Sequence, residues 1–349
     1  MYKKTRVIYV GKVPVGGGNP VSVQTMTKTD TRDIEATCEQ IKDIVGAGAD
    51  IVRCAIPDMD AAEKIKAIVK FSPIPVIADI HFDYRLAIKC AENGVACLRI
   101  NPGNIGSKQR IKEVVSACKH YGIPIRIGVN SGSLEKDLLE KYGNTPKAMV
   151  ESAKRHIGFL EDLNFFEIKV SLKSSDVKKT VEACRMFAKE FDYPQHIGIT
   201  EAGTENIGSV KSIIGIGALL IDGIGDTLRV SLTDSPVKEV VLGRNILKAL
   251  NLLPDSPKFV SCPTCGRIEF DIKKFASLIE KEIEKLNKPI TVAVMGCAVN
   301  GPGEAREADY AVCGGKGYAA IYKKGKLVKK VKEDNLIEEF LNLIRNDNE

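Results

Sequence analysis

Short, β-branched apolar runs alternate with longer amphipathic stretches between residues 20 and 250 of this chain. The short runs are typical of buried strands, which we predict at residues 21–26, 51–56, 75–80, 97–102, 124–130, 165–172, 196–201 and 226–232. Helical spacing of apolar positions predicts helices between and after them, at residues 33–47, 59–70, 84–93, 107–121, 145–163, 175–190, 204–219 and 236–250. Eight strand–helix units in about 230 residues predict a (β/α)₈ barrel.

A doubly wound open sheet is the alternative fold for such an alternation. It would carry a glycine-rich phosphate-binding turn after its first strand. The residues that follow the first predicted strand, TKTDTRD at 27–33, contain no glycine. The pattern therefore favours the barrel, which we place at residues 1–251.

The pattern changes beyond residue 251. Two prolines interrupt LLPDSPK at 252–258, and we interpret residues 252–261 as a linker. We then predict a helix at 271–286, a strand at 290–295, a hairpin at 318–331 that turns at Lys324-Gly325, and a closing helix at 333–345. These elements predict a small α/β domain over residues 262–349, which is too small to be an enzyme without the barrel.

Polar side chains stand at nearly every predicted strand end of the barrel. They are Gln24, Arg53, Asp79, His81, Arg99, Asn101, Arg126, Asn130, Lys169, Lys173, Glu201, Arg229 and Ser231. The carboxyl ends of barrel strands form one active-site face. A lone arginine is commonly solvated or half of an ion pair, but four at equivalent strand ends would repel one another without a bound anion. Guanidinium groups pair bidentately with phosphate oxygens, so we predict an anionic ligand, most simply a diphosphate.

Two further features near these strand ends allow more than one interpretation. Residues 101–107, NPGNIGS, form a glycine-rich turn that either offers backbone N–H groups to an anion or is an ordinary strand–helix loop. His81 and His196 lie beside strand ends. They can serve as acid or base, although core and supporting roles are commoner for histidine.

The second domain carries a group of cysteines with metal-ligand spacing. SCPTCGR places Cys262 and Cys265 in a bent loop, and VMGCAVNGPGEA places Cys297 on a glycine-rich loop that Glu304 follows. Three thiolates with no histidine nearby suit an iron–sulfur cluster better than a catalytic zinc. Two residues can supply the fourth ligand. Cys313 would complete a zinc ribbon or a closed cluster, whereas Glu304 would leave one iron with a ligand that a substrate can displace.

Composition narrows the class of protein. Of the 349 residues, 44% are hydrophobic, and no apolar run approaches the ~20 residues of a membrane span. The N-terminus lacks the apolar core of a signal peptide, and ten scattered cysteines are unlike a secreted disulfide scaffold, so we expect a cytoplasmic protein. A net charge of +6 with no tryptophan suits phosphorylated substrates better than nucleic acid.

With these patterns in view, the chain resembles the bacterial 4-hydroxy-3-methylbut-2-enyl diphosphate synthases, which are iron–sulfur enzymes of the non-mevalonate isoprenoid pathway. The resemblance runs nearly end to end. Its motifs are QTMTKTDT, IVRCAIP, ADIHFDY, LRINPGNIG, RIGVNSGSLE, VSLKSSD, HIGITEAG, GDTLRVSLT, SCPTCGR and VMGCAVNGPGEA.

The resemblance implies a barrel followed by a [4Fe-4S] domain, in the short form without an inserted domain. The implied reaction is the two-electron reductive ring opening and dehydration of 2-C-methyl-D-erythritol 2,4-cyclodiphosphate to (E)-4-hydroxy-3-methylbut-2-enyl diphosphate. Flavodoxin or ferredoxin would supply the electrons. The subunits would form a head-to-tail homodimer in which the cluster domain of one caps the barrel of the other.

The resemblance also implies roles for individual residues. One cluster per subunit would be held by Cys262, Cys265, Cys297 and Glu304, with Cys313 outside the site. The diphosphate contacts would come from Arg53, Arg99, Arg126, Lys173 and Arg229, with Asn101, Asn130 and Ser231 nearby. Glu201 would lie near the reacting carbons as a proton donor, which requires partial burial to raise its pKa.

A different class of function remains open from the residues alone. A phosphate-binding barrel with a zinc ribbon would act as an aldolase-type lyase or as a binding module without redox chemistry. Lys173 would be its candidate Schiff-base lysine. An iron and sulfide assay on anaerobically purified protein separates the two.

Overall fold

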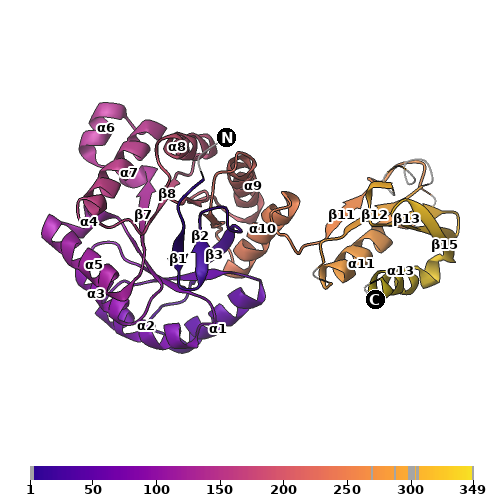
Figure 1. The fold of residues 1–349 in the computed structure, drawn as a ribbon, viewed down its shortest axis with the longest axis horizontal. Helices are drawn as coiled ribbons and strands as arrows, with labels where there is room; N and C mark the ends of the chain where they lie inside the picture. The colour runs from indigo at the N-terminus through magenta and orange to yellow at the C-terminus, as the bar shows by residue number, and fades with distance from the viewer. Residues whose placement is uncertain (1–3, 269, 287, 298–302, 304–305, 348–349) are drawn as a thin grey trace. The chain divides into compact units, whose positions relative to one another are not determined.

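The computed structural model describes residues 4–268, 270–286, 288–297, 303 and 306–347. The chain divides into two compact units, Met1–Leu250 and Asn251–Glu349, each of which we describe by itself (Figure 1). No helix among the described residues is long and apolar enough to cross a membrane.

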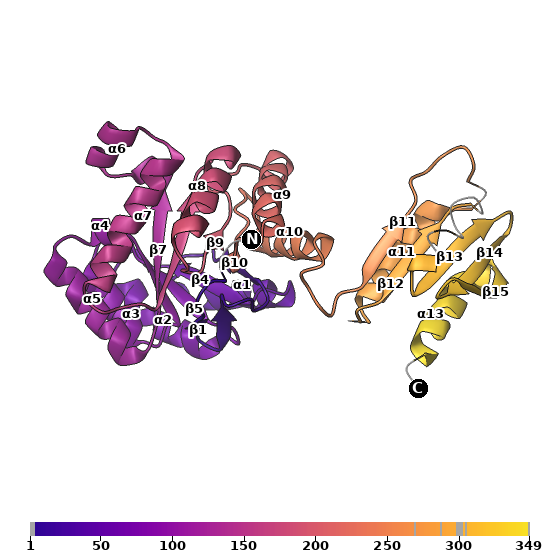
Figure 2. The ribbon, with the colours of Figure 1, turned by 45° about the horizontal axis from the view of Figure 1, so that its top comes forward.

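The first unit is a barrel of parallel strands ringed by helices (Figures 1 and 2). Its strands are β3 (Ser22–Met26), β4 (Ile51–Ala55), β5 (Val76–Asp79), β6 (Cys97–Ile100), β7 (Ile125–Asn130), β8 (Ile168–Lys173), β9 (His196–Ile197) and β10 (Thr227–Leu228). They pair in the order β8-β7-β6-β5-β4-β3-β10-β9. A single parallel bridge between Val170 and Gln195 joins the two ends of this sheet. The predicted (β/α)₈ barrel is confirmed.

The predicted helices follow their strands. They are α1 (Ile34–Gly46), α2 (Met59–Phe71), α3 (Tyr84–Glu92), α5 (Lys108–Tyr121), α7 (Pro146–Glu161), α8 (Val177–Glu190), α9 (Glu205–Ile221) and α10 (Pro236–Ala249). Most begin at a residue whose side chain accepts a hydrogen bond from a backbone N–H of the first turn; these are Asp33, Asp58, Asp83, Ser107, Thr145, Asp176 and Ser235. Such caps fix where each helix starts and therefore how the preceding loop leaves the barrel mouth.

Several short elements are additions to the predicted pattern. Two helices, α4 (Pro102–Ile105) and α6 (Lys136–Tyr142), and the 3₁₀ turn η1 (Ser131–Ser133) lie in loops after β6 and β7. A hairpin of β1 (Ile8–Val10) and β2 (Val13–Val15) precedes the barrel. Its buried Ile8, Val10 and Val15 pack against Ile51, Ile77 and Cys97 in one apolar cluster. The hairpin thus covers the amino-terminal end of the barrel.

Strands β9 and β10 are shorter than the predicted 196–201 and 226–232. The ladder stops at Gly198, where φ is +150° and an added Cβ would lie 2.2 Å from the carbonyl oxygen of Arg229. Glu201 follows with a φ of 50°. These conformations take the chain out of the sheet, so the remaining predicted residues form loops at the barrel mouth.

The described part of the second unit is built on a five-stranded sheet. Its elements are β11 (Lys258–Ser261), α11 (Ile272–Glu284), β12 (Thr291–Met295), β13 (Tyr310–Gly315), β14 (Tyr318–Lys323), β15 (Lys326–Lys332), η2 (Glu333–Asn335) and α13 (Leu336–Asn346). The strands pair in the order β11-β12-β13-β14-β15. Strands β11, β12 and β13 are parallel, and β13, β14 and β15 are antiparallel.

The predicted pattern for this unit needs two corrections. Residues 258–261, which we placed in the linker, form the edge strand β11. The strand is only four residues long and directly follows Pro257, so its two apolar residues, Phe259 and Val260, are too few to show a strand pattern. Strand β13 was not among the elements that we placed in this domain, although its run YAVCGG is compatible with a buried strand. The hairpin turn at Lys324-Gly325 is confirmed, and both residues have the positive φ that such a turn requires, 48° and 74°.

Candidate active site

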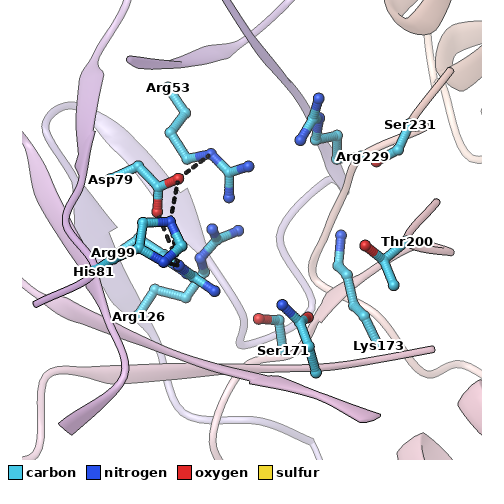
Figure 3. Close-up of a pocket in the computed structure, with 11 residues that line it drawn as sticks. Arg53, Asp79, His81, Arg99, Arg126, Ser171, Lys173, Thr200, Arg229 and Ser231 are labelled. Atoms are coloured by element: carbon cyan, nitrogen blue, oxygen red, sulfur yellow. Dashed lines mark hydrogen bonds and ion pairs between the residues drawn. The ribbon is translucent and has the colours of Figure 1, made fainter. Parts of the chain in front are cut away.

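A cavity of about 180 Å³ opens at the carboxyl ends of the barrel strands (Figure 3). Its lining is almost entirely polar and comes from β4, β5, β6, β7 and β8 and from the segments that follow β5, β9 and β10. The lining residues are Arg53, Asp79, His81, Arg99, Arg126, Asn130, Ser171, Lys173, Thr200, Arg229 and Ser231. Five of them are cationic and Asp79 is the one carboxylate, so the lining is strongly positive.

The parallel register aligns these side chains. Asp79 pairs with Arg99 in the β5–β6 ladder, and Arg99 pairs with Arg126 in the β6–β7 ladder. Residues that pair in a parallel ladder point to the same side of the sheet, here the barrel interior. Gly128 leaves room for this arrangement, because a Cβ there would lie 2.7 Å from Nε of Arg99.

Asp79 organises one side of the cavity. Its Oδ1 accepts a hydrogen bond from Nη1 of Arg99 at 3.1 Å, and Nε of Arg53 lies 3.9 Å from Oδ2. Nε2 of His81 lies 3.4 Å from the same Oδ2. Burial by itself would raise the pKa of Asp79, but Arg53, the hydrogen bond from His81 and Arg99 together hold it well below its usual range. Asp79 is therefore ionised at any physiological pH and fixes two guanidinium groups.

Arg126 is the least compensated charge in the cavity. It is 1% exposed, and its Nε and Nη1 have no hydrogen-bond partner within the described structure. Burial, followed by repulsion from Arg53 and Arg99, lowers its pKa well below the ordinary value. A buried cation with unused donors lacks an anion.

Lys173 lies on the other side of the cavity. Asn130 and Lys173 pair in the β7–β8 ladder, and a Cβ on Gly198 would lie 2.9 Å from the Lys173 ammonium. Burial, followed by repulsion from Arg126 and Arg229, lowers the pKa of Lys173 well below its ordinary value. An anion between Arg126 and Lys173 would favour the charged form of both.

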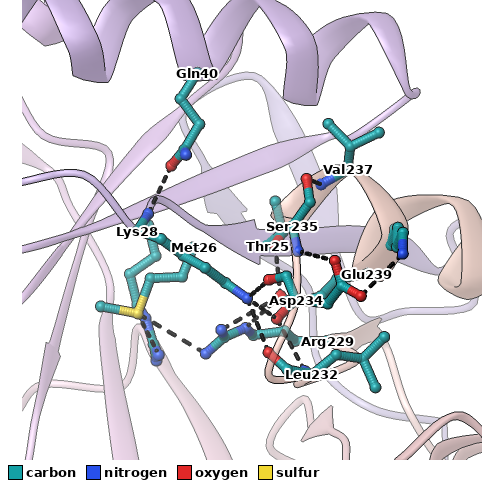
Figure 4. A network of polar contacts seen from close by, with 12 residues as sticks. Thr25, Met26, Lys28, Gln40, Arg229, Leu232, Asp234, Ser235, Val237 and Glu239 are labelled. Carbon is teal, nitrogen blue, oxygen red and sulfur yellow. Dashed lines mark hydrogen bonds and ion pairs between the residues drawn. The ribbon is translucent and has the colours of Figure 1, made fainter. Parts of the chain in front are cut away.

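Arg229 is held by a carboxylate that the sequence analysis did not single out. Glu239, which is 1% exposed, accepts from Nη2 of Arg229 at 3.3 Å and from the Thr25 hydroxyl at 2.8 Å (Figure 4). Its Oε1 accepts from the Leu232 backbone N–H at 3.0 Å and lies 3.2 Å from Nζ of Lys28. Glu239 therefore ties α10 to β3, to Arg229 and to the loop after β10.

A layer of buried polar groups lies in the same barrel. Lys169 is fully buried, its Nζ has no partner among the described residues, and burial lowers its pKa to about 8. His196 is also buried, and burial together with repulsion from Lys173 lowers its pKa well below the usual value. His196 is therefore a neutral residue of the barrel interior rather than an acid or base at the mouth.

The cysteines of the second unit gather at one edge of its sheet. Cys262 directly follows β11, and Cys297 stands two residues beyond β12, so the parallel pairing of these strands brings both to the same edge. The Gly296 N–H donates a hydrogen bond to Sγ of Cys262 at 3.2 Å, and bonds of this kind to cysteine sulfur tune iron–sulfur clusters. Cys265 is exposed on the loop that follows. Within the described residues no group of three or more His, Cys, Asp or Glu side chains stands ready to hold a metal, and Glu304 lies outside those residues.

Cys313 differs from these three cysteines. It is 4% exposed in the middle of β13, between Met295 and Ala320 of the neighbouring strands. Burial, with contributions from Cys297 and Cys262, raises the pKa of its thiol to about 11. Its surroundings are those of a small core residue.

Comparison with known proteins shows which protein family the chain belongs to. Residues 5–244 match the family described as GcpE TIM-barrel domain, and residues 258–346 match GcpE protein C-terminal domain. The chain belongs to the GcpE family. The resemblance that the motifs indicated is thereby confirmed.

Two relatives that match this GcpE chain over nearly their full length both carry the name 4-hydroxy-3-methylbut-2-en-1-yl diphosphate synthase (flavodoxin). A protein from Clostridium acetobutylicum is 57% identical over 98% of this chain and 99% of its own length. One from Geobacter sulfurreducens is 56% identical over 98% of this chain and 97% of its own.

Solved structures resemble the GcpE chain in fold alone. Dihydropteroate synthase from Yersinia pestis superposes with a TM-score of 0.51 at 11% identity, covering 70% of this chain and 98% of that protein. Phospho-2-dehydro-3-deoxyheptonate aldolase from Thermotoga maritima gives 0.50 at 13% identity, covering 72% and 74%.

Most of the strand-end residues predicted for substrate lie together in this GcpE barrel. The cavity brings together Arg53, Arg99, Arg126, Asn130, Lys173, Arg229 and Ser231. Asn101 does not line it, because its side chain accepts from the Gly103 N–H at 3.0 Å and caps α4. Glu201 is exposed and also does not line it, so the partial burial that we expected is not seen in the barrel unit.

Ser171 and Thr200 line the cavity but were not predicted as site residues. The sequence carried a signal for Ser171. Ser171 lies between Lys169 and Lys173 on β8, and all three have the period-two spacing of inward-facing residues. Glu239 had no such signal, since an acidic residue in the first turn of a helix is ordinarily explained by the helix dipole.

Proposed function

We propose that the chain is a 4-hydroxy-3-methylbut-2-en-1-yl diphosphate synthase, which opens the ring of 2-C-methyl-D-erythritol 2,4-cyclodiphosphate by two-electron reduction with loss of water. The chain is an oxidoreductase of the GcpE family. The observation that carries the assignment to this site is the buried, uncompensated Arg126 in a cavity lined by four further cations. Such a cavity needs an anionic ligand, and a cyclic diphosphate supplies two negative charges.

In this proposal the substrate binds in the cavity at the carboxyl ends of the barrel strands. Arg53, Arg99, Arg126, Lys173 and Arg229 contact the diphosphate oxygens, and Asn130 and Ser231 add neutral hydrogen bonds. Asn101 does not contact the diphosphate in this proposal; its side chain fixes the start of α4. When the ring opens, a phosphate ester oxygen leaves with additional negative charge. Prealigned cations stabilise that charge more in the transition state than in the ground state.

Proton delivery falls to Glu201 in the proposal. One oxygen of the substrate departs as water, which requires a proton donor close to the reacting carbons. The exposed position of Glu201 at the mouth makes it available to a bound ligand, and the partial burial that a donor needs would come with the bound state. Asp79 is excluded from this role, because its neighbours keep it ionised.

We assign one [4Fe-4S] cluster per subunit to the second unit, with Cys262, Cys265, Cys297 and Glu304 as ligands and Cys313 outside the set. Two of the cysteines stand at the ends of adjacent parallel strands, and a backbone N–H already donates to the sulfur of Cys262. The buried Cys313, with its raised pKa, is poorly suited to be a thiolate ligand. The cluster would supply electrons one at a time, and flavodoxin, which the names of the relatives give, or ferredoxin would reduce it.

We place the protein in the cytoplasm, as its reduced cysteines suggest, and propose a head-to-tail homodimer. Helix α9 supports self-association. Ile207, Val210, Ile214 and Ile221 are between 46% and 73% exposed and follow the spacing of a coiled-coil seam, with Gly217 at the remaining seam position. A charged residue at Ile214, in Ile214→Glu, should shift the sedimentation coefficient toward that of a monomer.

The function is tested with anaerobically purified protein. It should contain about four iron and four sulfide per chain and should convert the cyclic diphosphate to the linear allylic diphosphate when reduced flavodoxin is added. Phosphorus NMR distinguishes substrate from product. A colourless protein that contains zinc would instead favour the lyase that the sequence left open. A protein with a full complement of iron and sulfide but no turnover would contradict the proposed reaction and would leave the cluster assignment standing.

A further inference from the structure

A group of lysines stands out on the hairpin of the second unit. Residues 310–332 contain seven lysines and no acidic residue; the lysines are Lys316, Lys323, Lys324, Lys326, Lys329, Lys330 and Lys332. Lys323 forms an ion pair with Asp347, and Lys329 forms one with Glu339. The other five form no ion pair with the residues that the structure describes. Residues 310–332 therefore carry a concentrated positive charge, most of which is not balanced by acidic side chains of the described residues.

The lysines divide between two ends of the hairpin. Strands β11, β12 and β13 are parallel, so the turn that follows β13, at Lys316, lies at the same edge of the sheet as Cys262 and Cys297. Lys332 pairs with Tyr318 directly after that turn. Lys324 and Lys326 surround the β14–β15 turn, at the opposite edge. Figure 2 shows β13, β14 and β15 side by side.

The lysines also divide between the two faces of the sheet. Lys330 pairs with Ala320, and Ala320 pairs with Cys313 on the next strand, so Lys330 shares the face of Cys313. Lys332, two residues on, points to the same side. Lys329 points to the opposite side, where its partner Glu339 belongs to α13. Strand β15 thus presents Lys330 and Lys332 on the face where the cysteines gather.

An exposed aromatic ring completes this corner. Tyr318 is 40% exposed, and Nζ of Lys330 lies 5.3 Å from the centre of its ring. Gly315 permits the ring to lie flat against β13, since a Cβ there would lie 2.6 Å from Cζ of Tyr318. We call Lys316, Tyr318, Lys330 and Lys332 the lysine patch. Exposed tyrosine rings are enriched at protein interfaces, and the lysines beside this one add positive charge around it.

We propose that the lysine patch is the docking surface for the acidic face of the one-electron donor protein that reduces this enzyme. The inference rests on the proposed function, because it takes the cysteine edge as the place where electrons enter. A basic patch beside that edge steers a negatively charged partner and holds it near the electron acceptor. Edge strands also carry lysines simply to prevent pairing with other chains. That explanation applies equally to both ends of β15, whereas docking applies to the cysteine end.

Two double variants with the same change in net charge separate these explanations. The first, Lys330→Glu with Lys332→Glu, reverses the patch. The matched control, Lys324→Glu with Lys326→Glu, reverses the same amount of charge on the same hairpin at the opposite edge. Binding of a bacterial flavodoxin that contains FMN is measured by calorimetry at about 50 mM and about 200 mM salt, a range over which screening of surface charge increases. This readout does not require a loaded cluster or turnover.

We expect the patch variant to bind flavodoxin at least tenfold more weakly than the wild type at low salt, and to lose most of the salt dependence. The control should stay within about threefold. With dithionite as the reductant, both variants should turn over the cyclic diphosphate as the wild type does, because this small molecule needs no docking surface. Loss of turnover with dithionite in the wild type would count against the proposed function and not against the patch.

Equal weakening in both variants would overturn the proposal, since it would show a general effect of charge. Unchanged flavodoxin binding in the patch variant would overturn it as well. If the variant with Lys330→Glu and Lys332→Glu aggregates during size-exclusion chromatography, glutamine replaces glutamate in both double variants. Lys330→Gln with Lys332→Gln is then compared with Lys324→Gln and Lys326→Gln by flavodoxin calorimetry and by turnover with dithionite. Weaker flavodoxin binding in the first pair alone supports the proposal, and equal or unchanged binding in both pairs overturns it.

Discussion

Replacing Arg126 with Met should weaken substrate binding and stabilise the empty protein at the same time. Methionine approximates the length of the arginine stem without its charge. In the empty cavity the guanidinium is buried with two unpartnered nitrogens, which penalises the folded state. Removing an uncompensated buried charge should therefore raise the free energy of unfolding. We expect a gain of about 1 kcal/mol or more, which corresponds to roughly 2–4 °C in Tm for a domain of this size.

The loss in binding follows from the same two nitrogens. A hydrogen bond that involves a charged group contributes about 1.5–3 kcal/mol, so two contacts from Nε and Nη1 to phosphate oxygens correspond to roughly 3–6 kcal/mol. At the lower end of this range the Kd rises about 100-fold, because each tenfold change corresponds to about 1.4 kcal/mol.

The assay is thermal unfolding with and without the cyclic diphosphate, in the absence of reductant so that no turnover occurs. At a substrate concentration of 100 times the wild-type Kd, the ligand should stabilise the wild type by about 2.7 kcal/mol. The variant, now at a concentration near its own Kd, should gain only about 0.4 kcal/mol by the same relation. Arg85→Met is the control, since Arg85 is exposed and pairs with Asp83 outside the cavity. A less stable Arg126→Met protein that still binds substrate normally would refute the reasoning.

Three further experiments, with four substitutions, test the rest of the barrel and the cysteine edge. Asp79→Asn removes the carboxylate that holds Arg53 and Arg99. Breaking these buried ion pairs should lower the free energy of unfolding, measured in urea, by about 3–5 kcal/mol. A decrease below about 1 kcal/mol would show that the positions of the two arginines do not depend on Asp79. Lys169→Met should raise Tm at pH 7, and this gain should shrink as the pH rises from about 8, the pKa of Lys169 in the folded protein, toward its ordinary value near 10.5. The reason is that in this interval the unfolded chain binds the proton of Lys169 more tightly than the folded protein does, so the wild type gains stability with pH. A gain in Tm that does not change with pH would assign the effect to packing. Cys313→Ser should retain iron and sulfide, whereas Cys262→Ser should lose them; equal loss in an anaerobic iron assay would make Cys313 a ligand.

The barrel could be predicted from the sequence because its strands are buried on both sides and its helices begin at recognisable caps. The same logic failed where these signals were weak. The hairpin β1–β2 has strands of three residues, too short to show a period. Strand β11 is only four residues long and directly follows Pro257, so it was interpreted as a linker. Strands β9 and β10 were predicted too long, since the apolar pattern continues through Gly198 although its conformation ends the ladder.

The cations of the site could be predicted, but their relation to the anions could not. Strand-end position alone indicated that Arg53, Arg99, Arg126 and Arg229 meet at one face. Nothing in the sequence distinguished the arginines that would find a carboxylate from the one that would not. Glu239 reaches Arg229 from a helix ten residues further along the chain, and the sequence pattern explains its position equally well as a helix-start residue.

This division of the charges has a consequence for the ligand. Asp79 neutralises one of the pair Arg53 and Arg99, and Glu239 faces Arg229, so two carboxylates offset two of the five cations around the cavity. The lowered pKa of Lys173 disfavours its charged form in the empty site, and an anion bound between Lys173 and Arg126 would favour that form. We therefore expect Arg126 and Lys173 to respond most to a bound ligand, and the arginines that already contact a carboxylate to change least.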